Sequence, residues 1–482
     1  MRGIYSLIFF MSAYPLFAQE NAPISAIDWL SQPGLAPVAE EPVEKESRPT
    51  NSQNKITVSK LDILENKTFG LIPLEISNIP TNFWTELDSD TLMQLLINQP
   101  RSGLPATDDL LVRALLAETS GNTGVLLSRA ESLIDRGATK AAFNLIKQSE
   151  IKDEKSFEMF AKVSLLTGNI KQMCGILNGA RHLSKNDALK VYCQSDSGSS
   201  MTAKISYITL QALGAFEPKI SNLLAAYLDP DISHDFVPPD FDPLEITPLE
   251  FQLYNSINRP IPLKNLPIKF ASLDLEDPVS WANQINAAER LVKIGSLPTN
   301  LLLQIYNNGQ ASMPGKLWER VRSVQALHLV LSDPIIDPIN ELNKFWDIQK
   351  DKKLVAALAR AWSDKLLEFD ATAINSKVLF QMQVLSSSNV FPFEKTMQKL
   401  QEQNKPFSPK MFEVIRNTFK KRITTPIEFR AVNILRAMRL ISESLDGDLL
   451  ALEKGINLYR AMGLTPLAQQ LTLEYMIMAK NK

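Results

Sequence analysis

The chain has 482 residues, of which 45% are apolar and 22% charged, and its formal net charge is −2 at pH 7. This length and apolar content supply enough hydrophobic core for two or three domains. A net charge near zero gives no indication of a polyanionic partner, so it argues against a nucleic-acid-binding protein.

Residues 1–18 have the pattern of a secretory signal peptide. Arg2 supplies the positive charge, residues 4–10 form a short apolar run, and cleavage is expected near Ala18–Gln19. No later apolar run approaches the length of a membrane span. We therefore expect an exported, periplasmic protein whose mature chain has no transmembrane span.

Residues 19–55 are rich in Pro, Glu, Ser and Asn. Such a segment cannot bury enough apolar surface to fold by itself, so a disordered amino-terminal tail is predicted. Within it, the SAIDWL motif at residues 25–30 is a small apolar cluster. Ile27, Trp29 and Leu30 are candidate anchors for binding a partner. The alternative, that the motif packs on this protein's own surface, remains open.

Residues 56–87 are predicted to form a short extended or β-containing segment. Ile56 to Val58 are β-branched and open a strand or small hairpin that runs through Leu64. Residues 69–84 combine turn formers with apolar side chains, so we expect an extended stretch along the first helices with Trp84 buried.

The first helical half is predicted at residues 88–229, where glycines interrupt amphipathic segments. Gly137, Gly168 and Gly198 lie about 30 residues apart, which is close to the period of helical-hairpin repeats. Each fits the left-handed position just after a helix. Short helices must bury their apolar stripes against neighbours. The pattern predicts a tetratricopeptide-like solenoid, and an ordinary helical bundle is the alternative.

Cys174 and Cys193 are the two cysteines of the chain. They lie on consecutive predicted helices on either side of a turn, so an antiparallel helix pair brings them to nearly the same height. In an exported protein this favours a disulfide bond. Two buried free thiols are the alternative.

A proline-rich link is predicted at residues 230–246 and a second helical half at 247–482. Residues 247–250 (Thr-Pro-Leu-Glu) form a capping-box pattern that marks a helix start, and residues 425–428 (Thr-Pro-Ile-Glu) repeat it before an expected helix at 429–440. No strand pattern interrupts this half. The predicted fold class is all-α.

The order of these features resembles an uncharacterised family of large exported helical-repeat proteins from alphaproteobacteria. The resemblance rests mainly on residues 25–30 after an export signal, and then on residues 70–73, 79–84 and 192–193. Some members of that family carry an automatic "antifreeze" label, but this chain shows no regular array of Thr or Ala that would bind ice. The resemblance implies export and a helical fold, and it implies no active site.

No catalytic, cofactor-binding or metal-binding residues are predicted. The histidines His182, His234 and His328 are scattered singly, without partners at metal-ligand spacing. The sequence has no nucleophile elbow and no glycine-rich phosphate loop.

Residues 399–422 carry more basic than acidic side chains, with phenylalanines interleaved. The candidate basic patch comprises Lys410, Arg416, Lys420, Lys421 and Arg422. It could contact an anionic surface or an acidic partner. The alternative is a solvated helix face above a phenylalanine core.

These features favour an exported scaffold or adaptor that binds an envelope protein or a peptide without catalysis. One alternative is an enzyme on an α-superhelix that acts on the cell wall, although Glu443–Ser444 lies inside the helical array without a separate catalytic domain. A structural cell-envelope protein is the other alternative. The sequence leaves the partner and the oligomeric state open.

Overall fold

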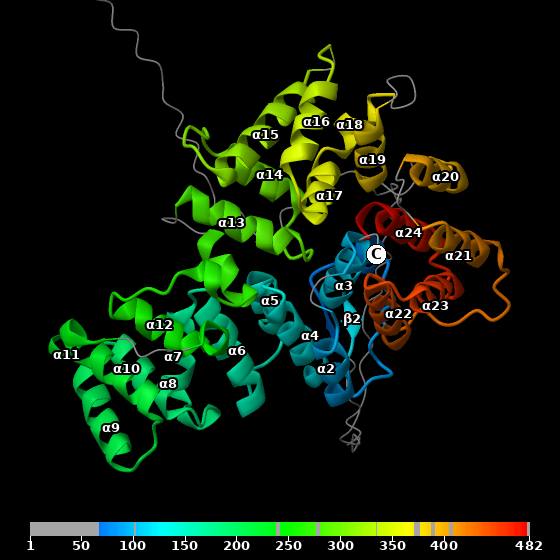
Figure 1. The fold of residues 1–482 in the computed structure, drawn as a ribbon. Helices are drawn as coiled ribbons and strands as arrows, with labels where there is room; N and C mark the ends of the chain where they lie inside the picture. Colours follow the sequence, from blue (N-terminus) through cyan, green and yellow to red (C-terminus); the bar gives the residue numbers. More distant parts are fainter. Residues whose placement is uncertain are drawn as a thin grey trace, which may run out of the picture. The chain divides into compact units, whose positions relative to one another are not determined.

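The computed structural model describes residues 67–100, 103–237, 242–275, 280–333, 335–370, 376–386, 391–403 and 408–479. Within these ranges the chain is mostly helical, which confirms the predicted all-α class (Figure 1). The described strands are β1 (Thr68–Phe69) and β2 (Thr119–Ser120), which pair antiparallel. The strand predicted near residues 56–64 lies outside the described residues.

The helices before the proline-rich link are short. They are α1 (Leu74–Ser77), α2 (Ser89–Ile97), α3 (Pro105–Leu116), α4 (Thr123–Asp135), α5 (Thr139–Ile146), α6 (Glu154–Leu166), α7 (Ile170–Gly179), the 3₁₀ turn η2 (Arg181–Leu183), α8 (Asp187–Asp196), α9 (Ser200–Ala212) and α10 (Pro218–Leu228). Gly137, Gly168 and Gly198 follow α4, α6 and α8 with φ of 78°, 72° and 83°. These values confirm the predicted left-handed helix ends, which glycine adopts without strain.

From α4 to α10, each helix packs against the next one in the chain. The predicted apolar stripes fill these contacts: Leu126 and Leu133 of α4 and Phe157 of α6 are fully buried. Phe143 of α5 stacks on Phe160 of α6 with ring centroids 5.8 Å apart. Because helices of this length are marginal alone, contacts between neighbours supply most of their stability.

The remaining elements are also short helices and 3₁₀ turns. They are α11 (Pro230–Asp235), η3 (Pro243–Glu245), α12 (Pro248–Ser256), η4 (Leu263–Asn265), η5 (Ile268–Leu275), α13 (Trp281–Val292), α14 (Thr299–Asn307), α15 (Lys316–Val330), α16 (Ile339–Ile348), α17 (Lys352–Ala361), α18 (Ser363–Leu367), α19 (Lys377–Ser386), α20 (Phe393–Gln403), α21 (Pro409–Lys420), α22 (Ala431–Ser444), α23 (Leu449–Ala461) and α24 (Thr465–Met478). Across the predicted link, α12 packs on α6 and α10, and Gln252 Nε2 donates to the carbonyl of Leu165 (2.6 Å).

One of the two predicted capping boxes forms. At the start of α12, Thr247 Oγ1 accepts from the Glu250 N–H and Glu250 Oε2 accepts from the Thr247 N–H. The second prediction, a helix start at residues 425–428, is wrong because α22 begins at Ala431. There Ile427 N donates to the Ala461 carbonyl (3.0 Å), so a tertiary hydrogen bond holds the segment outside the helix.

The last helices return to the first ones. α24 and α17 pack on α3, and α22 packs on α2 (Figure 1). Ala431 N donates to the carbonyl of Phe83 (3.2 Å). Trp84 is fully buried, as predicted, and Phe83 beside it lies 5.3 Å from the Phe429 ring. In a linear stack of hairpins each repeat contacts only its neighbours, so the repeat pattern does not predict this return.

A buried arginine holds the β1–β2 pair against α4. Arg129 is 1% exposed, and its guanidinium donates to four oxygens. The acceptors are the carbonyls of Leu115 (3.0 Å), Phe69 (3.1 Å) and Ala117 (2.6 Å) and Thr119 Oγ1 (2.9 Å). Burial lowers the pKa of Arg129 to about 9, so the group stays protonated at neutral pH. It therefore links α4 to β1, to β2 and to the end of α3 through charge-assisted hydrogen bonds.

Arg129→Met is expected to destabilise the protein by about 3 kcal/mol or more, because it removes a donor from three buried carbonyls and a hydroxyl. Urea denaturation measures this change. Arg113→Met on the exposed face of α3 is the matched control and should change stability by no more than about 0.5 kcal/mol. Equal stability of the two variants would contradict the role assigned to Arg129.

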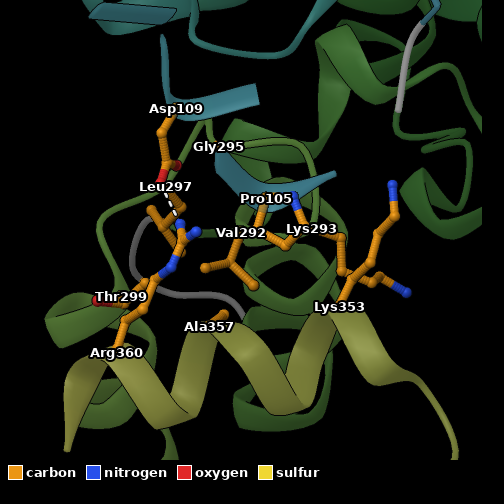
Figure 2. Close-up of a pocket in the computed structure, with 10 residues that line it drawn as sticks. All are labelled: Pro105, Asp109, Val292, Lys293, Gly295, Leu297, Thr299, Lys353, Ala357 and Arg360. Carbon is orange, nitrogen blue, oxygen red and sulfur yellow. Dashed lines mark hydrogen bonds and ion pairs between the residues drawn. The ribbon is translucent and has the colours of Figure 1, made fainter. Parts of the chain in front are cut away.

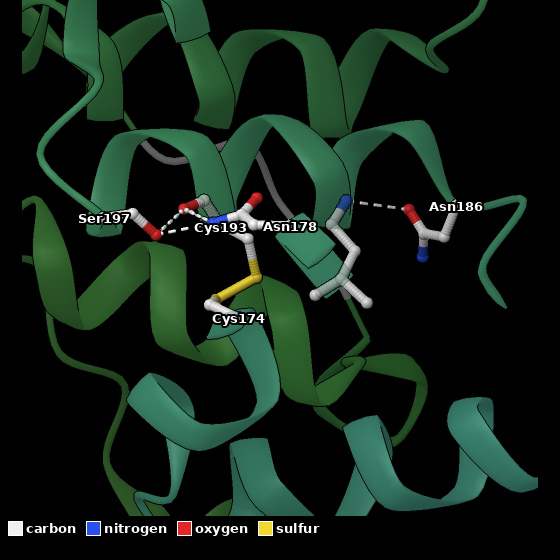
Figure 3. The surroundings of a disulfide bond; sticks show 6 residues. Cys174, Asn178, Asn186, Cys193 and Ser197 are labelled. Carbon is white, nitrogen blue, oxygen red and sulfur yellow. Dashed lines mark hydrogen bonds between the residues drawn. A yellow bond between two sulfur atoms is a disulfide. The ribbon is translucent and has the colours of Figure 1, made fainter. Parts of the chain in front are cut away.

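The predicted disulfide is present. Cys174 of α7 and Cys193 of α8 are joined with their Cα atoms 4.9 Å apart (Figure 3). Both residues are at most 1% exposed. Beside the bond, Asn178 Nδ2 donates to Ser197 Oγ (2.6 Å) and to the carbonyl of Cys193 (3.3 Å). The covalent link and these hydrogen bonds hold α7 to the carboxyl end of α8.

Replacing both cysteines, C174A/C193A, should lower the free energy of unfolding by about 3 kcal/mol, because the bond closes a loop with a sequence separation of 19. Denaturation with and without reductant measures the effect. Reductant should shift the wild-type curve toward that of the variant and leave the variant unchanged. A reductant-insensitive wild-type curve would argue against the bond.

Candidate functional site

Helix α9 carries apolar side chains on two opposite faces. Ala203 and Tyr207 are buried on one face, and the Tyr207 hydroxyl lies 3.1 Å from Ser221 Oγ of α10. On the opposite face Met201 and Ile205 are 71% and 60% exposed. A helix that is apolar on all sides is normally buried on all sides, so α9 presents a face that lacks a covering element within the described residues.

The exposed face follows one line along the helix. Met201, Ile205, Ile208 and Ala212 recur at intervals of three and four residues, which places them side by side. Ile208 is 63% exposed. We call these four residues the α9 stripe. A contiguous exposed apolar patch of this kind marks an interaction site more often than a scattered single residue does.

The borders of the α9 stripe carry one charged residue, Lys204. Thr202, Thr209 and Gln211 flank it and are exposed. The sequence of α9 has one charged residue, Lys204, and its Nζ lies 3.9 Å from Asp229 Oδ2. The one cationic group beside the stripe thus lies near a carboxylate, so the stripe offers little attraction to anionic lipid or polymer and suits an apolar partner.

A groove lies between α10 and α11, the next two helices. It has a volume of about 590 Å³, within the range of ordinary ligand pockets. The lining residues are Asn222, Ala225, Asp231, Ile232, Phe236 and Val237. Ile232 is 48% and Val237 82% exposed. The groove combines an apolar wall with one carboxylate and one amide, a set that suits an apolar side chain and adjacent peptide groups.

A second cavity lies between α3, α17 and the connection from α13 to α14 (Figure 2). Its lining residues are Pro105, Asp109, Val292, Lys293, Gly295, Leu297, Thr299, Lys353, Ala357 and Arg360. Its volume of about 20 Å³ is enough for one water molecule. Although it gathers several charged groups, this cavity is too small for a substrate.

The charges beside this cavity are paired with each other. Asp108 is 3% exposed and accepts from Arg136 Nη2 (2.6 Å) and the N–H of Gly103 (3.0 Å). Lys353 Nζ donates to the Gly103 carbonyl and lies 4.0 Å from Asp108 Oδ2. Burial raises the pKa of Asp108, with Arg136 and Lys353 opposing the rise, and burial lowers the pKa of Lys353.

A second set of pairs joins α3, α17 and α24. Arg360 donates to Asp109 and to Glu474 Oε1 (2.7 Å), as Figure 2 shows for Asp109. Glu474 is fully buried and also accepts from Ala106 N (3.0 Å) and Gln470 Nε2 (3.0 Å). Burial raises the pKa of Glu474, with Arg360 opposing the rise.

We call the set Asp108, Asp109, Arg136, Lys353, Arg360 and Glu474 the ionic seam. Removing one member of a buried pair leaves the other charge uncompensated, which strongly destabilises the folded protein. The seam therefore fixes the first helices to the last ones, and its geometry supports a structural role.

Of the scattered histidines, His182 and His234 are exposed, and the structure also places His328 and the Glu443–Ser444 pair. His328 Nδ1 accepts from Trp362 Nε1 (3.1 Å), and burial lowers the pKa of His328. Ser444 is fully buried and donates to the Ile441 carbonyl (2.6 Å), while Glu443 pairs with Arg439 on the surface. Within the described residues, no group of three or more His, Cys, Asp or Glu side chains is arranged to hold a metal ion.

The candidate basic patch lies along α21 and the residues after it. Lys410, Arg416, Lys420, Lys421 and Arg422 are all exposed. Lys421 pairs with Glu453. Phe419 packs against Phe393 with centroids 4.5 Å apart, so this aromatic side chain belongs to the helix packing. An anionic partner for the patch remains a prediction.

The remaining predicted residues, Ile27, Trp29 and Leu30, lie outside the described residues, as do the predicted signal peptide and tail. Among the helices that the structure describes, none has the length and apolar content to cross a membrane. No protein-family model, curated protein or solved structure matches the chain.

The sequence reasoning missed the α9 stripe, although a signal was present. Met201, Ile205 and Ile208 recur at helical spacing opposite Ala203 and Tyr207, so α9 has two apolar stripes where a half-buried helix needs one. The ionic seam gave no such signal, because its members come from parts of the chain far apart in sequence.

Glu474→Gln should alter how stability depends on pH. Because burial raises the pKa of Glu474 in the folded state, the folded protein binds more protons than the unfolded chain above pH 4.5. This contribution to the free energy of unfolding therefore falls as pH rises from 4.5 through the folded-state pKa. The variant lacks it, so the stability advantage of wild type over variant should shrink over that range.

Urea titrations of both proteins between pH 4.5 and 8 measure this difference. Glu443→Gln removes a carboxylate from the exposed side of α22 and controls for the loss of one negative charge. A constant difference between wild type and Glu474→Gln at all pH values would contradict the prediction.

Proposed function

We propose that this protein is an exported, periplasmic scaffold or adaptor that binds a protein or peptide partner and does not transform it. The observation that carries the proposal is the groove between α10 and α11, with its exposed side chains of Ile232 and Val237. Exposed apolar walls beside polar groups are typical of surfaces that bind peptide side chains.

The helical arrangement supports a scaffold. In this proposal, the consecutive packing of α4 to α10 is a short solenoid of helical hairpins, whose neighbour-by-neighbour stacking leaves extended surfaces for binding. The Cys174–Cys193 disulfide supports an oxidising compartment such as the periplasm.

Binding would use the chemistry of the groove. An apolar side chain of the partner would lie against Ala225, Ile232 and Phe236, while Asn222 and Asp231 would accept hydrogen bonds from backbone or basic groups of the same peptide. Ile27, Trp29 and Leu30 of the tail are proposed as a second contact with the partner. Two modest contacts on one chain would increase the overall affinity through effective concentration.

A photo-crosslinking amino acid at position 237 should capture a specific partner in intact cells, because Val237 is 82% exposed at the groove. The same amino acid at position 335, where Ile335 is 92% exposed away from the groove residues, is the matched control. Mass spectrometry identifies adducts that form at position 237 and not at position 335.

The identified partner is then purified and titrated against the wild-type protein. We expect I232E/V237E to weaken binding at least tenfold, since it puts two charges on an apolar wall, and I335E to leave binding unchanged. Deleting residues 19–55 should weaken binding further. Identical adducts at positions 237 and 335, or unchanged affinity of I232E/V237E, would overturn the proposal.

A further inference from the structure

We propose that two copies of this protein associate through their α9 stripes, with the two helices antiparallel about a two-fold axis. The inference rests on the sequence and exposure of α9 and is independent of the groove between α10 and α11. The occupant of the stripe is thus a second copy of the chain.

The first argument is that the α9 stripe is complementary in size to itself. When two α9 helices run antiparallel with the axis between residues 206 and 207, Met201 of one copy faces Ala212 of the other, and Ile205 faces Ile208. The longest side chain thus meets the shortest, and two branched side chains of equal size meet at the centre. Alternation of large and small residues across facing positions is what closely packed helix pairs require.

The second argument is charge. In the same arrangement, Thr202 of one copy lies near Thr209 of the other along one border of the stripe. Along the opposite border, Lys204 of one copy lies near Gln211 of the other. No like charges oppose each other, although a two-fold axis always places identical surfaces together. A charged stripe would repel its own copy, whereas the hydroxyl and amide groups here can form hydrogen bonds across the border.

The third argument is the cost of leaving the stripe uncovered. Met201, Ile205 and Ile208 are 71%, 60% and 63% exposed, and Leu213 directly after the helix is 76% exposed. Covering these side chains removes apolar surface from water, which is the main favourable contribution to association. A single pair of helices is a small interface, so we expect a dissociation constant on the order of micromolar.

Sedimentation equilibrium of the full-length chain tests the proposal. We expect the mass to rise from the 54.0 kDa of one chain to twice that value as the concentration rises through the micromolar range. I205E/I208E should remain monomeric over the same range, and circular dichroism should show an unchanged fold because both positions are exposed. Leu329→Glu on α15, where Leu329 is 71% exposed, is the matched control and should dimerise like wild type.

Single cysteine variants test the antiparallel register. Both native cysteines are joined to each other, so an introduced thiol is the reactive one. A mixture of M201C and A212C should oxidise to a crosslinked dimer that contains one of each. M201C alone should not crosslink, since in the antiparallel register its two copies lie about 16 Å apart along the helix axis at 1.5 Å per residue.

Several results would overturn the proposal. They are a wild-type protein that stays monomeric up to high concentration, a dimer that persists in I205E/I208E, and efficient crosslinking of M201C with itself, which requires parallel helices. A different result would assign the stripe to another protein: the wild type stays monomeric, and I205E/I208E no longer captures the partner found by photo-crosslinking at position 237. I232E/V237E should leave the dimer intact, so this inference and the proposed function can fail separately.

Discussion

The buried carboxylate of Glu474 is the point on which the arrangement of the described helices depends. It is fully buried on α24, and it accepts from Arg360 of α17 and from the backbone of Ala106 at the start of α3. A buried charge is tolerated only when its hydrogen-bonding capacity is used. The three helices must therefore stay together for any of these groups to remain buried, and the return of the last helices to the first ones is a requirement of charge compensation as well as of packing.

Local features of the fold could be predicted because each depends on a few neighbouring residues. Gly137, Gly168 and Gly198 take the left-handed conformation after their helices, and the Thr247–Glu250 capping box forms as expected. The capping pattern at residues 425–428 fails since Ile427 bonds to the distant Ala461 carbonyl. A capping signal contributes about 1 kcal/mol, which a tertiary contact can readily outweigh.

The candidate sites also differ in whether the sequence alone could predict them. The α9 stripe could be found from helical periodicity, because Met201, Ile205 and Ile208 form a second apolar line on one helix. The ionic seam could not, since Asp108 and Lys353 are 245 positions apart and each reads alone as an ordinary surface charge. The groove between α10 and α11 needs the fold as well, because its walls come from two helices whose angle no local pattern specifies.

In the described residues, charged side chains hold helices together and apolar side chains form exposed surfaces. The amino-acid composition alone does not distinguish these two roles. Charged side chains are buried where α3, α17 and α24 meet, and apolar side chains are exposed on α9 and α11. This distribution is the reverse of what transfer free energies favour for each residue type. At the ionic seam, mutual hydrogen bonds offset the unfavourable burial. On α9 no described element covers the apolar face, and the proposed association requires a surface that compensates for this exposure. An external surface of matching shape and neutral charge meets that requirement, and a second α9 has both properties.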